Sequence, residues 1–281
     1  MKINHYIENK HSKFIIISGE DKKKFLQSII TNNIDRCTQN NLIYSCLLTP
    51  QGRFFADFFI SEHQNIYLIE IDKLYFDSFF EKLLMYKLRS KVEISFQDNF
   101  LSFVIFQELD FIREELTYIY KDPRHQEIGT KVYINKDSKN LKKLNELKKI
   151  NYESYRDLLM QHLIPNSTYD LIQNKSLLLE NNFENINAID WEKGCYVGQE
   201  LTARMKYRGL LKKKIHTLKI TSGNIKISDK VFDDEVEIGE VISKTDNYIL
   251  AMLRINLIEN LIGNKKIIST SEGAKVSFLL N

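Results

Sequence analysis

After Gly209 the sequence consists of short apolar segments of strand character, without helical periodicity. Five such segments follow one another at a spacing of about ten residues, from "KKIHTLKI" to "AKVSFLL". Short strands at this spacing, separated by turn residues, are typical of a small barrel or sandwich. The predicted turns contain Gly223, Gly239, Gly263 and Gly273. We therefore predict an all-β unit after Arg208, with no helix longer than about three turns.

The N-terminal half alternates strand and helix patterns. The segments "IYSCLLT" and "RFFADFFI" flank "PQG" at Pro50–Gly52, which predicts a β-hairpin. Asp72 is a suitable N-cap for a helix that runs to about Arg89. The predicted buried stripe of this helix is Leu74, Phe79, Phe80, Leu83, Leu84 and Leu88. The order of elements indicates an α+β fold with a largely antiparallel sheet.

A further helical pattern covers residues 138–162. Leu141, Leu144 and Leu147 recur at every third position with lysines between them. Pro165 follows the segment and stops the run. We predict helix throughout this range.

Composition narrows the classes of function. The chain has 40 Lys and Arg against 37 Asp and Glu, and a net charge of +3 is too weak a bias to indicate nucleic-acid binding. No apolar run reaches the roughly 18 residues of a membrane span. The first residues lack the apolar core of a signal peptide and the Arg-rich pattern of a transit peptide. Three cysteines are an odd number, so we expect a reduced, cytoplasmic protein without a disulfide framework.

One cysteine stands in an unusual context, the segment "EKGCYVGQELTAR" at Glu192–Arg204. A helix is predicted to start at Gly198, with Glu200 in its first turn and Arg204 four residues later. Cys195 precedes this helix, and Lys193 lies two residues before it. A helix N-terminus and a nearby cation both favour a thiolate, so Cys195 is a candidate reactive thiol. The alternative is a small buried apolar side chain.

The same segment carries a resemblance. "KGCYVGQE" resembles the K-G-C-[FY]-x-G-Q-E signature of the folate-binding YgfZ family over all eight positions, and Arg204 and Arg208-Gly209 extend the match. These proteins are iron–sulfur maintenance relatives of the glycine-cleavage T-protein, an aminomethyltransferase. The segments "SGEDKKKFLQSIITNNI", "LLTPQGRFFAD" and "DPRHQEIGT" resemble further family segments in the expected order.

This resemblance implies a three-lobed T-protein-like cloverleaf of mostly antiparallel sheets with helices, plus a small C-terminal all-β barrel. It divides the chain into a discontinuous core domain at 1–49 and 118–207, a second α+β domain at 50–117, and the barrel at 208–281. It further implies that tetrahydrofolate, or a one-carbon derivative, binds in the central hole. The implied role is assembly or repair of 4Fe–4S enzymes, including the radical enzymes that thiomethylate tRNA.

The resemblance also gives candidate site residues. Cys195 is the residue on which the family's function depends, and Lys193 is its candidate helper. The candidate folate contacts are Tyr155, Trp191, Tyr196, Gln199, Glu200 and Arg204. We assign no metal ligands and expect no metal bound to the protein as isolated, because Cys37 and Cys46 lack metal-ligand spacing and the six histidines are scattered. The expected partners are reduced folate and iron–sulfur client enzymes, and we expect a monomer without direct binding to nucleic acid or membrane.

Other residues leave alternatives open. Arg53 and Asp57 share one face of a predicted strand and meet either a ligand or each other. Arg124 either faces a central cavity or is clamped by Asp122 in its own turn. A basic cluster, defined as Arg204, Lys206, Arg208 and Lys212–Lys214, is either a solvated helix end or a site for the folate polyglutamate tail or an acidic partner.

Two further functions remain as alternatives to the iron–sulfur role. Shared ancestry with the T-protein suggests a tetrahydrofolate-dependent aminomethyltransferase, although no transferase carboxylate is identified by motif. The basic cluster suggests an RNA-binding module. The balanced charge and the absence of an aromatic-basic RNA motif argue against this second alternative.

Overall fold

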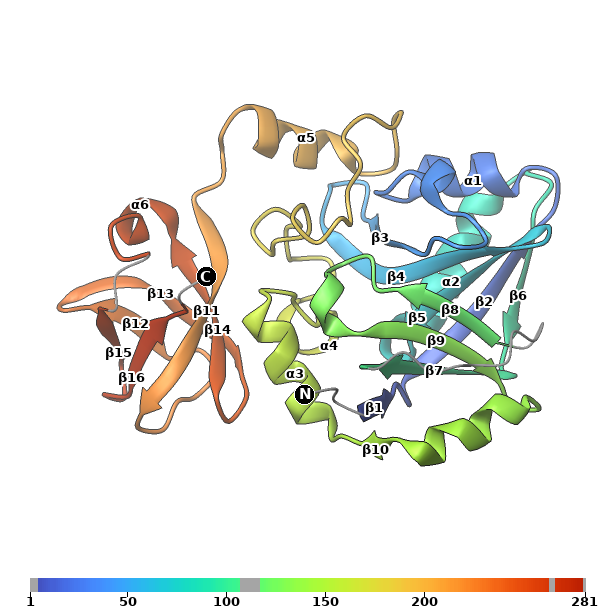
Figure 1. The fold of residues 1–281 in the computed structure, drawn as a ribbon. Helices are drawn as coiled ribbons and strands as arrows, with labels where there is room; N and C mark the ends of the chain where they lie inside the picture. Colours follow the sequence, from blue (N-terminus) through green and yellow to red (C-terminus); the bar gives the residue numbers. More distant parts are fainter. Residues whose placement is uncertain (1–4, 107–116, 263–265, 280–281) are drawn as a thin grey trace.

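Two five-stranded sheets and a closed six-stranded barrel make up the protein in a computed structural model (Figure 1), which describes residues 5–106, 117–262 and 266–279. The first sheet has the order β10-β1-β7-β9-β8. Its strands are β1 (His5–Glu8), β7 (Phe100–Ile105), β8 (Thr117–Lys121), β9 (Thr130–Asn135) and β10 (Lys148–Lys149). The second has the order β3-β4-β5-β2-β6. Its strands are β2 (Ser12–Ser18), β3 (Ile43–Leu48), β4 (Phe54–His63), β5 (Ile66–Asp72) and β6 (Glu93–Gln97).

Helices cover and connect these sheets. The α-helices are α1 (Lys22–Ile29), α2 (Lys73–Lys87), α3 (Tyr152–Gln161), α4 (Ser167–Asp170), α5 (Gln199–Tyr207) and α6 (Ile255–Ile258). The 3-10 helices are η1 (Ile34–Arg36), η2 (Gln126–Ile128) and η3 (Lys139–Glu146). Strand pairing is antiparallel in both sheets except between β1 and β10, which confirms the predicted α+β class. Among the described residues, none of the helices has the length and apolar composition needed to span a bilayer.

The predicted hairpin is formed by β3 and β4, in which Ser45 pairs with Phe58. Its turn uses Gly52 at a φ of 74°, which favours glycine. The two strands share one sheet across the predicted domain boundary at residues 49/50. The predicted domain boundaries at 49/50, 117/118 and 207/208 stay a prediction. The second of them adjoins residues outside the described ranges.

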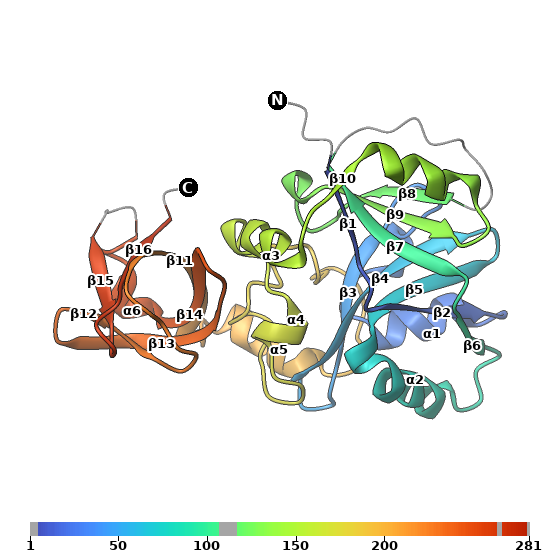
Figure 2. The ribbon, with the colours of Figure 1, turned by 90° about the horizontal axis from the view of Figure 1, so that it is seen from below.

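The helix predicted from Asp72 is α2, and its cap is confirmed because the amide of Leu74 donates to Asp72 Oδ1 at 2.8 Å. The predicted stripe is partly wrong. Leu74, Leu84 and Leu88 are exposed, and the buried side chains are Tyr75, Phe79 and Leu83. Positions four residues apart form a narrow stripe, because α2 lies against one face of the second sheet and leaves its other side in solvent (Figure 2).

The continuous helix predicted over 138–162 is wrong. The segment forms the 3-10 helix η3, then the short strand β10, and then α3. Leucines at every third position match the three residues per turn of a 3-10 helix, in which they share one side. Asn151 then starts α3, because its side chain accepts a hydrogen bond from the Ser154 amide at 2.7 Å.

The C-terminal barrel has the closed order β11-β14-β13-β12-β15-β16, which confirms the predicted all-β unit. Its strands are β11 (Lys213–Ser222), β12 (Lys230–Asp233), β13 (Val236–Lys244), β14 (Tyr248–Arg254), β15 (Ile267–Thr270) and β16 (Lys275–Phe278). The longest helix in its described part is α6, with four residues. The predicted turn at Gly239 is wrong, because this glycine lies within β13, where its backbone pairs closely with β14. The predicted turn at Gly263 lies outside the described residues.

The barrel has an apolar core of its own and meets α3 and α4 through polar contacts. The Thr217 hydroxyl donates to the Met160 carbonyl at 2.5 Å, and the Ser243 hydroxyl donates to Asp170 at 2.5 Å. Burial raises the pKa of Asp170 to about 6. These hydrogen bonds join the barrel to α3 and α4.

His63 gives a testable pH dependence. Burial lowers its pKa to about 4, and its Nε2 lies 2.8 Å from the Ser61 hydroxyl and 3.2 Å from that of Tyr120. His63 takes up a proton near pH 6.5 in the unfolded chain but only near pH 4 in the folded chain. The free energy of unfolding that this difference contributes is therefore present above pH 6.5 and is lost as the pH falls. Between pH 7 and pH 4, the free energy of unfolding should fall by roughly 3 kcal/mol less in His63→Gln than in the wild type. Urea unfolding at both pH values is the measurement. The exposed His11→Gln control should follow the wild type, and equal losses in all three proteins would contradict the assignment.

Candidate functional site

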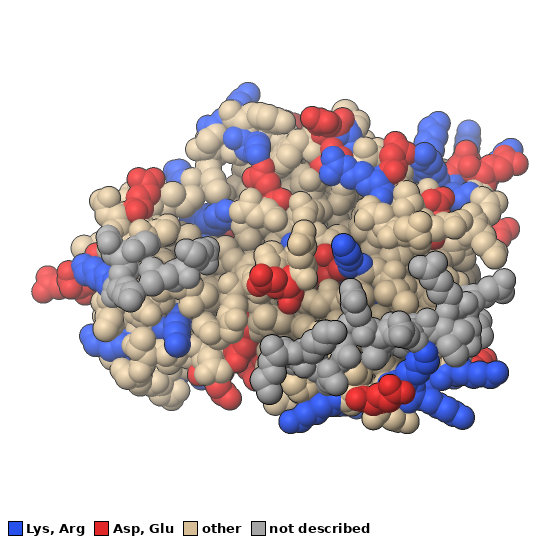
Figure 3. All heavy atoms as spheres, in the orientation of Figure 1, with Lys and Arg blue, Asp and Glu red and all other residues tan. Residues whose placement is uncertain are grey.

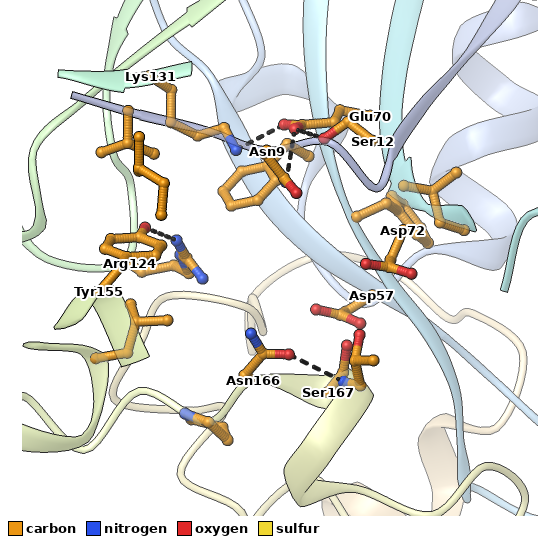
Figure 4. A pocket seen from close by; sticks show the side chains of 18 of the residues that line it. Asn9, Ser12, Asp57, Glu70, Asp72, Arg124, Lys131, Tyr155, Asn166 and Ser167 are labelled. Carbon is orange, nitrogen blue, oxygen red and sulfur yellow. Dashed lines mark hydrogen bonds and ion pairs between the residues drawn. The ribbon is translucent and has the colours of Figure 1, made fainter. Parts of the chain in front are cut away.

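A pocket lies between the two sheets and the α3–α4 segment (Figure 4). The space that it encloses is about 80 Å³, well below the usual range for small-molecule sites, so the pocket is narrow. Its wall combines aromatic rings with many polar side chains. The polar residues labelled in the figure are Asn9, Ser12, Asp57, Glu70, Asp72, Arg124, Lys131, Tyr155, Asn166 and Ser167.

A buried ion pair forms one side of this pocket. Lys131 Nζ lies 2.6 Å from Glu70 Oε2, and both side chains are only 3% exposed. The hydroxyls of Ser12 and Tyr133 also donate to Glu70, at 2.5 and 2.8 Å. Burial disfavours the Glu70 carboxylate, but the Lys131 charge and the hydrogen bonds outweigh it and hold the pKa of Glu70 below its ordinary value. The Lys131 ammonium also lies over the Phe59 ring, 3.8 Å from its centroid.

Arg124 fulfils both of its predicted alternatives, because it is clamped by its own turn and also lines the pocket. Its Nε and Nη2 donate to the two carboxylate oxygens of Asp122 at 3.0 and 2.8 Å. Nη2 also donates to the Tyr155 hydroxyl at 3.3 Å, which directs the tyrosine along the pocket wall (Figure 4).

Asp57 places a half-buried carboxylate opposite Arg124 and Tyr155 (Figure 4). Burial raises the pKa of Asp57, and hydrogen bonds from Ser167 and Tyr44 oppose this effect. The Tyr44 hydroxyl lies 2.5 Å from Asp57 Oδ2. Arg53, its predicted neighbour on the strand, instead donates to the Lys175 carbonyl at 3.0 Å. The sequence therefore left the role of Asp57 open, and its register in β4 directs it into the pocket.

Cys195 lies in a separate surface loop that is anchored on both sides. Before it, Lys193 Nζ donates to the carbonyls of Ile30 and Asn32 at 2.6 and 2.7 Å. After it, the Val197 amide donates to the Ser28 carbonyl at 3.1 Å. Cys195 itself is exposed. The loop therefore presents its thiol from a fixed base at the end of α1.

Lys193 serves as the main anchor of this loop. Its side chain is buried, and burial lowers its pKa to about 8, against the opposing charge of Asp190. Asp190 in turn accepts hydrogen bonds from the amides of Glu192 and Lys193 and pairs with Arg36 at 2.9 Å. The Lys193 ammonium is thus directed into the protein, and a role in helping Cys195 stays a prediction.

Two glycines join this loop to the β3–β4 turn. Gly198 precedes α5 at a φ of 80°, which confirms the predicted helix start. A Cβ atom on Gly198 would lie 2.4 Å from the Thr49 carbonyl oxygen, and one on Gly52 would lie 2.8 Å from the Gly198 carbonyl oxygen. Both positions therefore require glycine for space as well as for conformation.

Of the six candidate folate contacts, Tyr155 lines the pocket between the sheets, whereas the others belong to the Cys195 loop and α5. Trp191 packs edge-on against Tyr207 at 6.0 Å and carries Lys206 over its ring. Tyr196 is buried, and its hydroxyl has no hydrogen-bond partner among the described residues. Gln199 is half-buried at the start of α5, where Glu200 and Arg204 form the predicted ion pair. Folate contacts by these five residues stay a prediction.

The other two cysteines are buried, and burial raises the pKa of both the Cys37 and the Cys46 thiol. All three cysteines lie in described parts of the chain, so Cys195 is the exposed thiol of this protein. A reactive thiol needs solvent access and a stable thiolate. Among the cysteines, Cys195 alone meets the first condition.

Half of the basic cluster is paired with acidic side chains. Arg204 pairs with Glu200, Lys206 with Glu184, and Lys213 lies 3.9 Å from Glu180. On the face shown in Figure 3, basic and acidic side chains are interspersed. Nucleic-acid binding surfaces concentrate unpaired basic side chains, so this arrangement does not favour the RNA-binding alternative.

The two sheets and the barrel define a protein with the fold of the glycine-cleavage T-proteins. The solved structure of glycine cleavage system aminomethyltransferase T from Bartonella henselae superposes with a TM-score of 0.77 at 11% identity, covering 97% of this chain and 83% of that one. At this identity the likeness establishes the fold alone. The predicted T-protein-like fold with a C-terminal barrel is confirmed.

The chain also shows sequence similarity to curated proteins. The chain is similar to the iron-sulfur cluster assembly factor IBA57 homolog, mitochondrial, of Neurospora crassa, with 32% identity over 225 residues, 72% of this chain and 51% of that protein. It is also similar to the tRNA-modifying protein YgfZ of Aliivibrio fischeri, with 26% identity over 216 residues, 73% of this chain and 67% of that protein. No family model matches. The chain spans about half the length of the Neurospora relative. It belongs to the IBA57/YgfZ family, which confirms the predicted resemblance to the YgfZ family.

The predicted cytoplasmic location is wrong. The Neurospora relative and others, including one from Mus musculus, are named as mitochondrial, which points to mitochondria rather than the cytoplasm. The prediction relied on the first residues and on an odd cysteine count. An odd cysteine count argues only against an oxidising compartment, and the first residues of the sequence do not decide the location.

Proposed function

We propose that this chain is a folate-dependent accessory protein for the assembly or repair of 4Fe–4S enzymes, and that it acts as a monomer through Cys195. The observation that carries this proposal is the exposed thiol on an anchored loop. Its relatives are named as an iron–sulfur cluster assembly factor and as a tRNA-modifying protein. The clients therefore include radical enzymes that thiomethylate tRNA.

The test of the iron–sulfur role is complementation. Cells that lack their own relative and have lost 4Fe–4S enzyme activity should regain it when they express this chain in the compartment of those enzymes. Client activity and the iron content of the immunoprecipitated client are the two measurements. Wild-type expression at normal level without recovery of either would reject the role.

The pocket between the sheets is the proposed folate site. A reduced folate carries neighbouring N–H donors on its pterin edge, and the Asp57 carboxylate is suited to accept from them. The rings of Tyr155 and Phe59 offer apolar surface to the pterin. When bound, the folate would supply one-carbon chemistry, while the residues of this chain hold and orient it.

We expect Asp57→Asn to weaken tetrahydrofolate binding at least tenfold, because a hydrogen bond to a charged group contributes about 1.5–3 kcal/mol. Isothermal titration with tetrahydrofolate and its methylene form is the measurement. Asp35→Asn, at an exposed carboxylate, is the matched control and should bind as the wild type does. No heat of binding to the wild type at millimolar folate would contradict the pocket assignment and leave the Cys195 role to the complementation test.

The Asp57 carboxylate also favours a second candidate, a tetrahydrofolate-dependent aminomethyltransferase. Its support is the T-protein fold together with Asp57 in the pocket. A reconstituted glycine-cleavage assay decides between the two. Turnover with this chain in place of the T-protein would favour the transferase, and its absence favours the accessory role.

A further inference from the structure

Three side chains with metal-binding atoms meet outside both sites described above. His125 caps η2, Glu127 lies within η2, and His162 ends α3. Their nitrogen and oxygen ligand atoms all lie within 4.8 Å of one another. The two imidazole rings stack with centroids 4.1 Å apart at an angle of 30°.

The separation of these atoms suits a shared ion. Glu127 Oε2 and His162 Nε2 are 3.4 Å apart. Two ligand atoms on one tetrahedral zinc ion, each at about 2.0–2.1 Å, lie roughly 3.3–3.4 Å from each other. The third ligand, His125, belongs to the same turn as Glu127 and closes the set. Two imidazoles and one carboxylate form a ligand set that zinc uses in proteins.

The hydrogen bonding of His125 is compatible with this geometry. His125 Nδ1 accepts a hydrogen bond from the Glu127 amide at 3.2 Å, a long contact in an exposed turn. An ion bound at this nitrogen would replace that one hydrogen bond.

We propose that His125, Glu127 and His162 bind one divalent transition-metal ion of the zinc type. Two nitrogen ligands select against Mg²⁺ and Ca²⁺, which prefer shells made of oxygen alone. Three protein ligands leave one tetrahedral position for water or a ligand. The site shares no residue with the Cys195 loop or with the lining of the folate pocket.

The position of this site gives it a mechanical role. Arg124, which lines the pocket, directly precedes His125. His162 directly follows Gln161, whose side chain donates to the Tyr248 hydroxyl of the barrel at 3.0 Å. A bound ion would therefore join the turn that carries Arg124 to the C-terminal end of α3, which contacts the barrel.

The test uses the full chain, freed of metal with a chelator and titrated with Zn²⁺ by calorimetry and with Co²⁺ by visible absorbance. We expect one equivalent to bind, tetrahedral Co²⁺ bands, and no heat from Mg²⁺. His162→Gln and His125→Gln should each weaken Zn²⁺ binding at least tenfold. His11→Gln is the matched control at an exposed histidine, and Cys195→Ser controls for binding to the thiol. Both controls should bind as the wild type does.

Thermal unfolding supplies a second readout that does not depend on activity. Zn²⁺ should raise the Tm of the wild type and leave that of His162→Gln unchanged, because binding to the folded state stabilises it. Equal Zn²⁺ affinity in the wild type and His162→Gln would overturn the proposal, as would loss of binding in Cys195→Ser alone. If His162→Gln fails to fold by circular dichroism, Glu127→Gln takes its place, since that side chain is 73% exposed, and unchanged affinity there overturns the proposal equally.

Discussion

Lys131→Met should lower the free energy of unfolding by about 3–5 kcal/mol, because it leaves the buried Glu70 carboxylate without its cation. The methionine keeps most of the apolar stem, so lost packing contributes little. Urea unfolding at pH 7 is the measurement. The matched control is Lys91→Met, which breaks the pair with Glu20 at the surface, where the lysine is 72% exposed. That change should cost about 1 kcal/mol or less.

The double variant Lys131→Met with Glu70→Gln tests the cause. Neutralising the carboxylate removes the unpaired buried charge, so part of the lost stability should return. A double variant less stable than Lys131→Met would show that packing, not charge, explains the loss. A loss of under 1 kcal/mol in the single variant would show that water reaches Glu70.

Cys195→Ala should abolish rescue of 4Fe–4S enzyme activity while changing the free energy of unfolding by no more than about 0.5 kcal/mol. The thiol is exposed and the loop is held by Lys193 and Val197, so the truncation removes little packing. Complementation at matched expression and urea unfolding are the two measurements. Rescue equal to wild type would mean that the loop cysteine has no chemical role.

The buried cysteines provide the opposite pattern and so serve as controls. Cys37→Ser and Cys46→Ser should each lose about 1–2 kcal/mol while the folded protein still rescues. Alkylation rates across pH should identify Cys195 as the fastest thiol, because burial raises the pKa of the other two. Cys37 or Cys46 reacting first in the folded protein would contradict the assigned burial.

Local signals were readable from the sequence. The Asp72 cap, the Gly198 helix start and the hairpin at Pro50–Gly52 each depend on neighbouring residues, and each is confirmed. The continuous helix predicted over 138–162 is wrong because leucines at every third position suit a 3-10 helix better than an α-helix. The buried stripe of α2 is narrower than predicted, because the sequence does not show how much of the helix surface the sheet covers.

The pocket was not readable in the same way. Three strands, β4, β5 and β9, bring together Asp57, Glu70 and Lys131. The spacing of these residues along the sequence does not predict that they meet. His125 and His162 are 37 positions apart in the sequence, and only the fold stacks their rings. Arg124 was the exception, because both of its roles follow from one short turn.

The contact between Gly52 and Gly198 means that two distant motifs are one piece of structure. The backbone of the hairpin turn supports the last residue before α5, three positions after the exposed thiol. The position and orientation of the Cys195 thiol therefore depend partly on the β3–β4 turn at Gly52. A relative that acquires a side chain at either glycine has to rebuild the other segment, so the two positions are expected to be inherited together as a single unit.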